Sequence, residues 1–282
     1  MEFETIVVER PEPRIARIVM NRPEARNAQN LQMTYDLNAA FDQAVQDDAV
    51  KVIILAGNGP HFSSGHDLRP GSKNNAGVDF PPVGNWGGFA EPNAHGRFAR
   101  EQEIYLQITR RWRNLAKPTI AEVHGKCIAG GLMLAWACDL IVASQDAEFC
   151  DPVVTMGVCG VEWFVHPWEL GPRKAKEFLF CAETFSAEEA ERYGLVNRVV
   201  SRAELADAAR AMADKVALVP ALTAEMVKAS INHMVDLMGQ RESWRYHFML
   251  HQFVSNTPTA LAKVEARKEG GMDAVKREQG RT

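Results

Sequence analysis

Long apolar runs are missing from this chain of 282 residues. The longest, Ile128 to Cys138, contains two glycines and ends at Asp139, whereas a membrane-spanning helix needs about 20 apolar residues. The opening stretch, MEFETIVVERPEPR, is acidic and interrupted by prolines, unlike a signal peptide or a transit sequence. The sequence therefore predicts a cytoplasmic protein with no membrane partner.

An excess of positive charge is also missing. The chain has 32 Lys and Arg residues against 36 Asp and Glu, a formal net charge of −4. A nucleic-acid binder needs a basic surface to neutralise phosphates, so we expect no nucleic-acid partner. Its composition, 46% hydrophobic and 24% charged, is typical of a globular chain. Its length is near the upper limit for one hydrophobic core, about 250–300 residues.

Cysteine pairs at redox or metal-binding spacing are missing too. The five cysteines include no CxxC and lie mostly in apolar surroundings, which predicts reduced core thiols. The phosphate-binding GxxxxGK[ST] loop, the dinucleotide fingerprint GxGxxG and the nucleophile elbow GxSxG are also absent. We expect neither a metal site nor a nucleotide cofactor. A serine hydrolase built on Ser63 or Ser64 is disfavoured.

Short apolar runs alternate with amphipathic stretches in the first half of the chain. The runs at 16–20, 50–55, 119–123 and 140–143 predict strands. Between the first two, Met33, Leu37, Phe41 and Ala44 recur at helical spacing and predict a helix over 31–45. Strands that alternate with helices favour an α/β domain with parallel strand pairing.

The second half of the chain changes character. Beyond residue 200 nearly everything is helix-forming, so we place a core domain at 1–200 and a C-terminal helical region at 201–282. The apolar stripes of that region favour packing between subunits; an internal core is the alternative. They comprise Ile231, Met234, Leu237, Phe248, Met249 and Phe253. The loop-like segment 69–98 carries Phe80, Trp86 and Phe89 and predicts a lid or a pocket wall.

Two glycine-containing turns have the composition of a carbonyl-binding site. One spans 61–67 after a predicted strand, and the other spans 127–131 before a predicted helix. Glycine allows backbone approaches that a Cβ forbids. Two amide N–H groups from such turns, converging on one carbonyl oxygen, would form an oxyanion hole. Close packing of a strand against a helix is the alternative role for the glycines.

Five motifs in order resemble the crotonase superfamily, also called the enoyl-CoA hydratase/isomerase family. The resemblance covers about residues 5 to 200 and extends more loosely to about 270. The motifs are NRPEARNA at 21–28, FSSGHDL at 62–68, VHG through AGG at 123–131, ACDLIVA at 137–143 and GLVNRVV at 194–200.

The resemblance implies a spiral of repeated ββα units, followed by helices that form trimers, often paired into hexamers. It implies an acyl-CoA thioester substrate whose oxygen is held by the backbone N–H groups of Ser64 and Gly130. Coenzyme A is then part of the substrate, and no further cofactor is expected. The same resemblance has positively charged residues around 263–268 reach the nucleotide phosphates; an ordinary solvated charged face is the alternative. The implied substrate-binding residues are Arg26, Ala28, His66, Asp67 and Leu68.

The sequence departs from the family at the catalytic positions. Hydratases that it resembles carry two glutamates where this chain has Met133 and Val153. Neither side chain transfers a proton, so the two-glutamate hydration mechanism is excluded by residue type.

Three other residues are candidates for the missing acid or base. Asp151 precedes Val153 by two residues, so the two side chains would point the same way in an extended segment. Glu162 and His166 would be neighbours on a helical turn. Asp151 as a turn cap and Glu162–His166 as a structural pair are the alternatives.

Two classes of function remain open. The first is an enzyme that stabilises an enolate in a backbone oxyanion hole, for hydration or double-bond isomerisation of enoyl-CoA. The second is a non-catalytic acyl-CoA binder that keeps the pocket without the chemistry.

Overall fold

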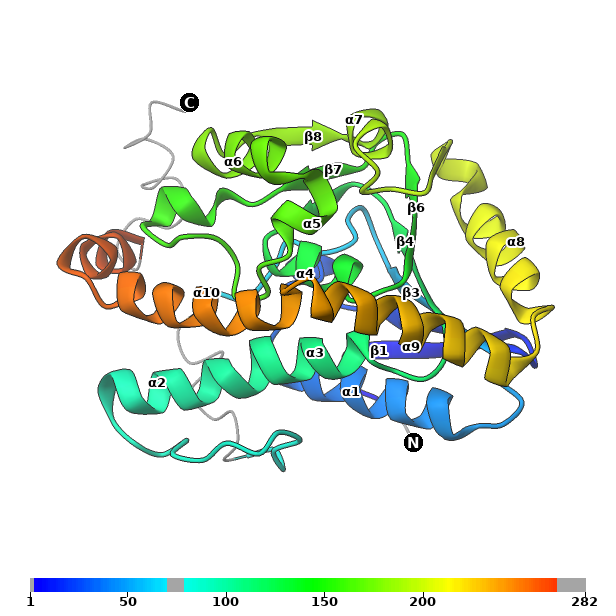
Figure 1. Cartoon of the computed structure of the whole chain (residues 1–282), viewed down its shortest axis with the longest axis horizontal. Helices are drawn as coiled ribbons and strands as arrows, with labels where there is room; N and C mark the ends of the chain where they lie inside the picture. The colour runs from blue at the N-terminus through cyan, green and yellow to red at the C-terminus, as the bar shows by residue number, and fades with distance from the viewer. Residues whose placement is uncertain (1–2, 70–78, 268–282) are drawn as a thin grey trace.

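The structure, a computed structural model, describes residues 3–69 and 79–267. Its elements are, in chain order, β1 (Ile6–Glu12), β2 (Ile15–Met20), η1 (Pro23–Ala25), α1 (Leu31–Gln46), β3 (Val52–Gly57), α2 (Asn93–Glu101), the π-helical η2 (Gln102–Gln107), α3 (Ile108–Arg113), β4 (Thr119–Val123), β5 (Lys126–Ile128), α4 (Gly130–Trp136), β6 (Leu140–Ser144), β7 (Glu148–Cys150), η3 (Pro152–Met156), α5 (His166–Leu170), α6 (Pro172–Phe180), β8 (Thr184–Ser186), α7 (Ala187–Arg192), β9 (Arg198–Val200), η4 (Arg202–Glu204), α8 (Leu205–Ala217), α9 (Ala221–Leu237) and α10 (Gln240–Ser255). Figure 1 shows this arrangement.

Two sheets organise the chain. The larger one has the order β1-β2-β3-β4-β6-β9, antiparallel only between β1 and β2 in its described strands, and the smaller one has the order β5-β7-β8. Successive strands leave one sheet for the other: β4 is followed by β5, then α4, and β6 is followed by β7. This alternation is the spiral of ββα units, so the expected α/β fold class is confirmed.

The local patterns of the sequence produced most of these elements where expected. The strands expected at 16–20, 119–123 and 140–143 are β2, β4 and β6. The helix expected over 31–45 is α1, capped by the Asn30 side chain, which accepts a hydrogen bond from the N–H of Met33. Ser186 and Glu189 form a capping box at the start of α7. These features depend only on neighbouring residues, which is why the sequence reveals them.

Helix α8 packs on the larger sheet, as Figure 1 shows. Its buried face, which includes Leu205 and Ala209, joins Ile15, Ile54 and Val142 in a second core cluster. The boundary predicted at residue 200 therefore does not separate α8 from the core. Helix α10 is not separate from the core either, because Trp244 and Phe248 belong to the main core cluster. Residues 268–282 of the predicted C-terminal region lie outside the described structure.

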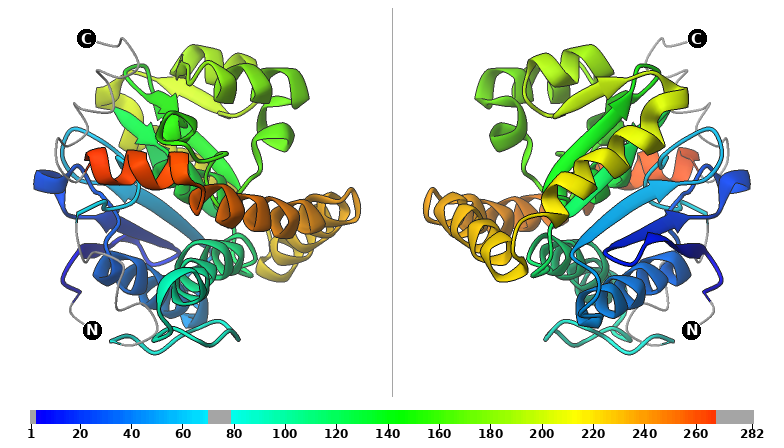
Figure 2. Two further views of the ribbon diagram at one scale, coloured as in Figure 1. Left: turned by 90° about the vertical axis from the view of Figure 1, so that its left-hand side faces the viewer. Right: turned by 90° about the vertical axis from the view of Figure 1, so that its right-hand side faces the viewer.

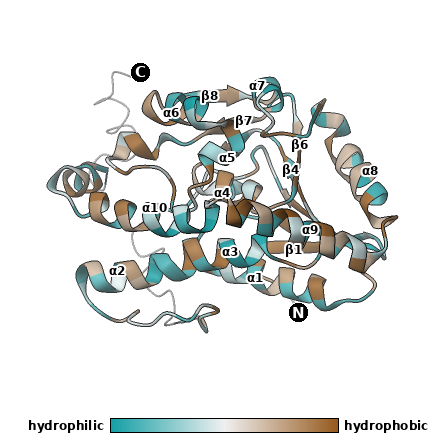
Figure 3. Ribbon diagram, in the orientation of Figure 1, coloured by the Kyte–Doolittle hydropathy of each residue, from teal (hydrophilic) through white to brown (hydrophobic). Residues whose placement is uncertain are grey.

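Helices α9 and α10 expose much of their apolar surface. Figure 2 shows α9 projecting from the body of the molecule, and Figure 3 shows hydrophobic residues along it. Leu222, Ile231 and Leu237 are 67%, 58% and 70% exposed. Phe253 of α10 is 73% exposed, whereas Phe248 on the same helix is buried. The residues 3–69 and 79–267 contain no helix with both the length and the apolar character of a membrane span.

Candidate active site

The two glycine-containing turns lie side by side. The N–H of Ser63 donates to the carbonyl of Lys126 at 3.0 Å, and the N–H of Ile128 donates to the carbonyl of Ser63 at 3.0 Å. Gly65, with φ of +96°, comes so close to the second turn that a Cβ there would lie 2.8 Å from the Ile128 oxygen and 3.1 Å from the Gly130 nitrogen. Glycine is required at this position by both its conformation and its contacts.

Ser64 does not offer its amide to this site. Its N–H donates to the carbonyl oxygen of Arg26 at 3.0 Å. The single amide hydrogen is therefore used within the protein, and the expectation that Ser64 supplies an oxyanion-hole N–H is wrong. Within the described part of the chain, no residue accepts a hydrogen bond from the N–H of His66 or of Gly130. Both amides therefore remain available to a bound group.

The imidazole of His66 occupies the space that Gly130 leaves by having no side chain. A Cβ on Gly130 would lie 2.6 Å from Nδ1 of His66 and 2.5 Å from its Cε1. The ring stacks on Tyr105 with centroids 3.8 Å apart, and its Nε2 lies 3.2 Å from Oε2 of Glu162. The His66 side chain is only 9% exposed. Expected as a substrate-binding wall residue, His66 is also a partner of Glu162.

The segment that carries Tyr105 is the π-helical turn η2, between α2 and α3. Single π-helical turns inside α-helices are frequent at functional sites. Burial raises the pKa of the Tyr105 hydroxyl well above its ordinary value, and the nearby negative charge of Glu162 adds to this shift. The ring of Tyr105 therefore stays neutral beside the imidazole of His66.

Glu162 lies between two imidazoles. Its second oxygen, Oε1, is 3.5 Å from Nε2 of His251 in α10, and Nδ1 of His251 lies 2.9 Å from the carbonyl oxygen of Gly160. Glu162 and His251 are 6% exposed. We name His66, Glu162 and His251 the imidazole–carboxylate cluster. His251 could not be predicted from the sequence, because no local pattern links it to Glu162, 89 positions earlier in the chain.

Glu162 and His166 do not share a helix face. Glu162 lies in a bend before α5, and His166 is the first residue of that helix. Their side chains have separate partners: His66 and His251 for Glu162, and Asp151 for His166. The expected neighbouring pair is therefore wrong, and each residue belongs to its own charged group.

Asp151 and His166 form a completely buried pair. Oδ2 of Asp151 lies 2.9 Å from Nε2 of His166 and accepts the N–H of Val161 at 3.0 Å. The other oxygen accepts the N–H of Val153 and caps η3. The segment after Asp151 is thus helical rather than extended, so the expectation that Asp151 and Val153 point to the same side fails. The alternative, a turn cap, agrees with the structure.

The positions of the family glutamates are apolar and buried. Met133 in α4 is 2% exposed, and Val153 in η3 is 8% exposed. Both belong to the main hydrophobic core. No water-activating pair is present at these two positions.

The expected CoA-binding residues occupy different environments. Asp67 is buried and holds the turn, because Arg22 and Arg69 donate to its carboxylate. Burial opposes ionisation, but the hydrogen bonds from Arg69 outweigh it and lower the pKa of Asp67. Arg26 is exposed with φ of +54°, Leu68 is 38% exposed, and the carbonyl of Ala28 accepts a hydrogen bond from Arg22. Of the positions expected around the nucleotide phosphates, Lys268 lies outside the described residues.

Two sets of side chains lie close enough together to ligate a cation. Cys159, His247 and His251 form one set, and Glu101, Glu162 and His251 the other, with ligand atoms within 4.8 Å of one another in each. Both carboxylates already have protein partners. Arg97 and Gln252 contact Glu101, and the two imidazoles contact Glu162. Neither set was predicted from the sequence, from which no metal site was expected.

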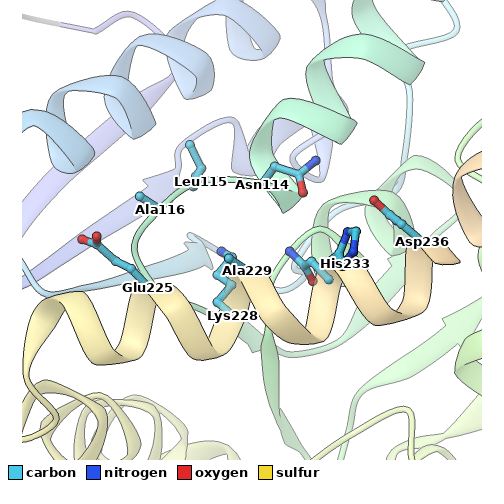
Figure 4. A pocket seen from close by; sticks show the side chains of 9 residues that line it. Asn114, Leu115, Ala116, Glu225, Lys228, Ala229, His233 and Asp236 are labelled. Carbon is cyan, nitrogen blue, oxygen red and sulfur yellow. The ribbon is translucent and has the colours of Figure 1, made fainter.

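A surface pocket elsewhere is separate from the glycine turns. Figure 4 shows it between α9 and the connection from α3 to β4. Lys228, at its edge, donates to the carbonyl of Lys117 at 3.1 Å and pairs with Asp139 at 2.8 Å. None of the candidate catalytic residues lines this pocket. It is lined by Asn114, Leu115, Ala116, Glu225, Lys228, Ala229, Asn232, His233 and Asp236.

Comparison with known proteins agrees with this architecture. The family model for enoyl-CoA hydratase/isomerase matches residues 10–80 and 90–269. A putative enoyl-CoA hydratase EchA13 of Mycobacterium tuberculosis is 44% identical over 256 residues, covering 89% of this chain and 80% of the relative. A probable enoyl-CoA hydratase of Rhizobium meliloti is 33% identical, covering 96% of this chain and 94% of the relative.

Solved structures give the same result. The crystal structure of a probable enoyl-CoA hydratase from Mycobacterium thermoresistibile has a TM-score of 0.81 at 41% identity, covering 92% of this chain and 98% of that one. The crystal structure of a probable enoyl-CoA hydratase from Mycobacterium smegmatis has a TM-score of 0.79 at 45% identity, covering 88% of this chain and 93% of that one. With the ββα spiral and the paired glycine turns, these matches show that the chain belongs to the enoyl-CoA hydratase/isomerase family of the crotonase superfamily.

Proposed function

We propose that this protein is an enzyme that acts on an enoyl-CoA thioester by stabilising an enolate in a backbone oxyanion hole. The N–H groups of His66 and Gly130 are assigned as the donors to the thioester oxygen. The observation that carries this assignment is that these two amides have no acceptor in the described structure while their turns are hydrogen-bonded together. The similarity to proteins named enoyl-CoA hydratases supports the substrate class.

Fixed amide donors suit an enolate because its negative charge develops on the thioester oxygen. Donors already in place need no reorganisation as that charge forms, and losing one such donor typically costs about 2.7–4 kcal/mol of transition-state stabilisation. Coenzyme A arrives as part of the substrate, and the proposal involves no additional cofactor.

Proton transfer at the α-carbon is the chemistry that these residues support best. Hydration requires both an activated water and a proton donor, and the positions that serve hydratases of the family hold Met133 and Val153. Moving a double bond between the β,γ and α,β positions requires one group that removes a proton and returns it. We therefore favour double-bond isomerisation over hydration.

Hydrogen exchange tests this function directly. The protein is incubated in deuterated water with a 3-enoyl-CoA, a 2-enoyl-CoA and a saturated acyl-CoA, and deuterium incorporation at the α- and γ-carbons is followed by mass spectrometry. We expect exchange and interconversion of the two enoyl thioesters. Free acid in place of the thioester is the control, because its carboxylate cannot form the same enolate. Absence of exchange with every thioester would contradict the proposal.

A non-catalytic acyl-CoA binder is the second candidate. Its support is the apolar character of Met133 and Val153 together with the structural role of Asp151. Tight binding of an enoyl-CoA by calorimetry without any exchange in the same experiment would favour this candidate.

A homo-oligomer accompanies the proposed function. Large apolar side chains are exposed along both α9 and α10, and contiguous exposed apolar patches mark protein–protein contacts. Ile231, Met234 and Leu237, expected from the sequence to pack between subunits, are 58%, 59% and 70% exposed. We propose that this surface packs against other copies of the chain.

A further inference from the structure

One side-chain nitrogen beside the proposed oxyanion hole is buried without a partner. Nδ1 of His66 is inaccessible to solvent and makes no hydrogen bond with the described residues. It lies against Gly130, as the short distance to a Cβ at that position shows. A buried polar atom without a partner is costly, typically about 1–3 kcal/mol. Nδ1 of His166 and Nε2 of His247 are two others in the described structure.

The other nitrogen of the same ring is fixed by a carboxylate. Nε2 of His66 lies 3.2 Å from Oε2 of Glu162, which is a hydrogen bond only if Nε2 carries a hydrogen. The neutral imidazole then has its lone pair on Nδ1. Stacking on Tyr105 holds the plane of the ring, with centroids 3.8 Å apart and an interplanar angle of 23°. Carboxylate and aromatic ring together leave one nitrogen free and point it toward Gly130.

His251 lies on the opposite side of Glu162. Its Nδ1 donates to the carbonyl of Gly160, which orients the ring, so its Nε2, 3.5 Å from Oε1 of Glu162, holds the carboxylate only if that nitrogen carries a hydrogen as well. The carboxylate therefore lies between two rings from distant parts of the chain. Carboxylates that fix the tautomer and orientation of a catalytic histidine play this role in serine proteases.

We propose that His66 is the catalytic base and acid of this enzyme, with Glu162 and His251 as positioning residues. This inference rests on the proposed function and deepens it. His66 then has two roles: its backbone N–H binds the thioester oxygen, and its Nδ1 transfers the proton. The α-carbon is bonded to the thioester carbonyl carbon, so a carbonyl held by Gly130 brings that carbon toward the His66 ring. The ring must shift away from Gly130 for the covered Nδ1 to reach that carbon.

The proton transfer balances without any other reactant. Nδ1 takes a proton from the α-carbon of a 3-enoyl thioester, and the electron pair of the broken C–H bond delocalises onto the thioester oxygen as a dienolate. The imidazolium is stabilised by Glu162. Nδ1–H then returns the proton to the γ-carbon, which gives the 2-enoyl thioester and restores the neutral ring.

The decisive experiment measures isomerisation and deuterium exchange for His66→Ala. The backbone N–H remains in this variant, so thioester binding is expected to persist while kcat falls by about 10²–10⁴-fold. Added imidazole is expected to restore part of the activity, which a purely structural role of His66 would not predict. His66→Gln, which fills more of the space, repeats the test if His66→Ala is unstable.

Glu162→Gln tests the positioning role. It keeps the size of the side chain but removes the charge that stabilises the imidazolium, so kcat is expected to fall at least about tenfold with KM little changed. Glu162→Asp should recover part of that loss. His124→Gln is the matched control: it removes a buried imidazole that bonds to the Gly59 carbonyl, outside the cluster, and should leave kcat unchanged.

The possible outcomes distinguish failure of the role proposed for His66 from failure of the proposed isomerase function. If the unmodified protein isomerises enoyl-CoA and His66→Ala or His66→Gln does so at the same rate, His66 is not the acid–base group, although the proposed function stands. If the unmodified protein shows no exchange with any thioester, both proposals fail.

Discussion

Asp151 and His166, 15 positions apart in the sequence, place a carboxylate oxygen 2.9 Å from an imidazole nitrogen, and neither side chain is exposed at all. The same carboxylate accepts two backbone N–H groups, from Val153 and Val161. Asp151 thereby fixes the path of the chain between η3 and α5. Glu162 lies in this segment, next to Val161, and its side chain contacts His66.

Removal of the Asp151 carboxylate should be strongly destabilising. Asp151→Ala leaves buried donors without an acceptor, so we expect the free energy of unfolding to fall by about 3–5 kcal/mol. Urea denaturation followed by circular dichroism measures it. Glu9→Ala is the control, because Glu9 forms an exposed ion pair with Arg17 at 2.7 Å, and such pairs contribute less than about 1 kcal/mol. Equal losses in the two variants would contradict a structural role for Asp151.

A methyl group at position 130 should disturb the site through His66. The Cβ of Gly130→Ala would lie 2.5 Å from Cε1 of the His66 ring, so the ring must move away. Displacement of a reacting group by about 1 Å can cost on the order of 100-fold in rate, and we expect kcat to fall by about that factor. Gly87→Ala is a suitable control, since nothing lies within 4 Å of a Cβ there. An unchanged kcat in Gly130→Ala would show that the position of the His66 ring against residue 130 does not affect catalysis.

Acid should destabilise the protein partly through His124. Burial, with smaller contributions from the positive charge of Arg202, lowers the pKa of His124 from 6.5 to about 4. Below about pH 6.5, His124 is therefore protonated in the unfolded chain but remains neutral in the folded protein until the pH approaches 4. Stability associated with His124 is complete above pH 6.5 and is lost as the pH falls toward 4.

Denaturation curves at pH 7.5, 6, 5 and 4.5 test this dependence. We expect His124→Gln to lose less stability than the parent protein between pH 6.5 and 4.5, because glutamine takes up no proton in this range. Other buried groups contribute equally to both proteins and cancel in the comparison. Parallel stability curves for the two proteins would refute the assignment.

Charge on the apolar face of α9 should dissociate the proposed oligomer. Ile231 and Leu237 are 58% and 70% exposed on that helix. A carboxylate buried at a subunit interface without a partner costs several kcal/mol, so Ile231→Asp or Leu237→Asp should shift the molar mass toward that of one chain, 31.4 kDa. Light scattering coupled to size-exclusion chromatography measures this. Asp214→Asn on α8 provides a control variant away from the face. A parent protein that is already monomeric would contradict the oligomer itself.

The strand and helix pattern of the first half was readable from the chain because it depends on residues near one another. Strands β2 and β4, helix α1 and the capping box at Ser186 follow from spacing alone. The placement of α8 did not follow in this way. Its apolar stripe is compatible with packing on a sheet or on another helix, and only the assembled core decides between them.

The sequence by itself determined the family motifs, their order, and the absence of glutamates at positions 133 and 153, because each of these is a matter of residue type. The tertiary structure alone decided which amides are free and which carboxylate meets which imidazole. Ser64 was excluded by a carbonyl 38 positions away, and Glu162 was paired with a histidine 96 positions away. A hydrogen bond requires two atoms at about 3 Å, and between distant segments that distance is fixed only when the chain has folded.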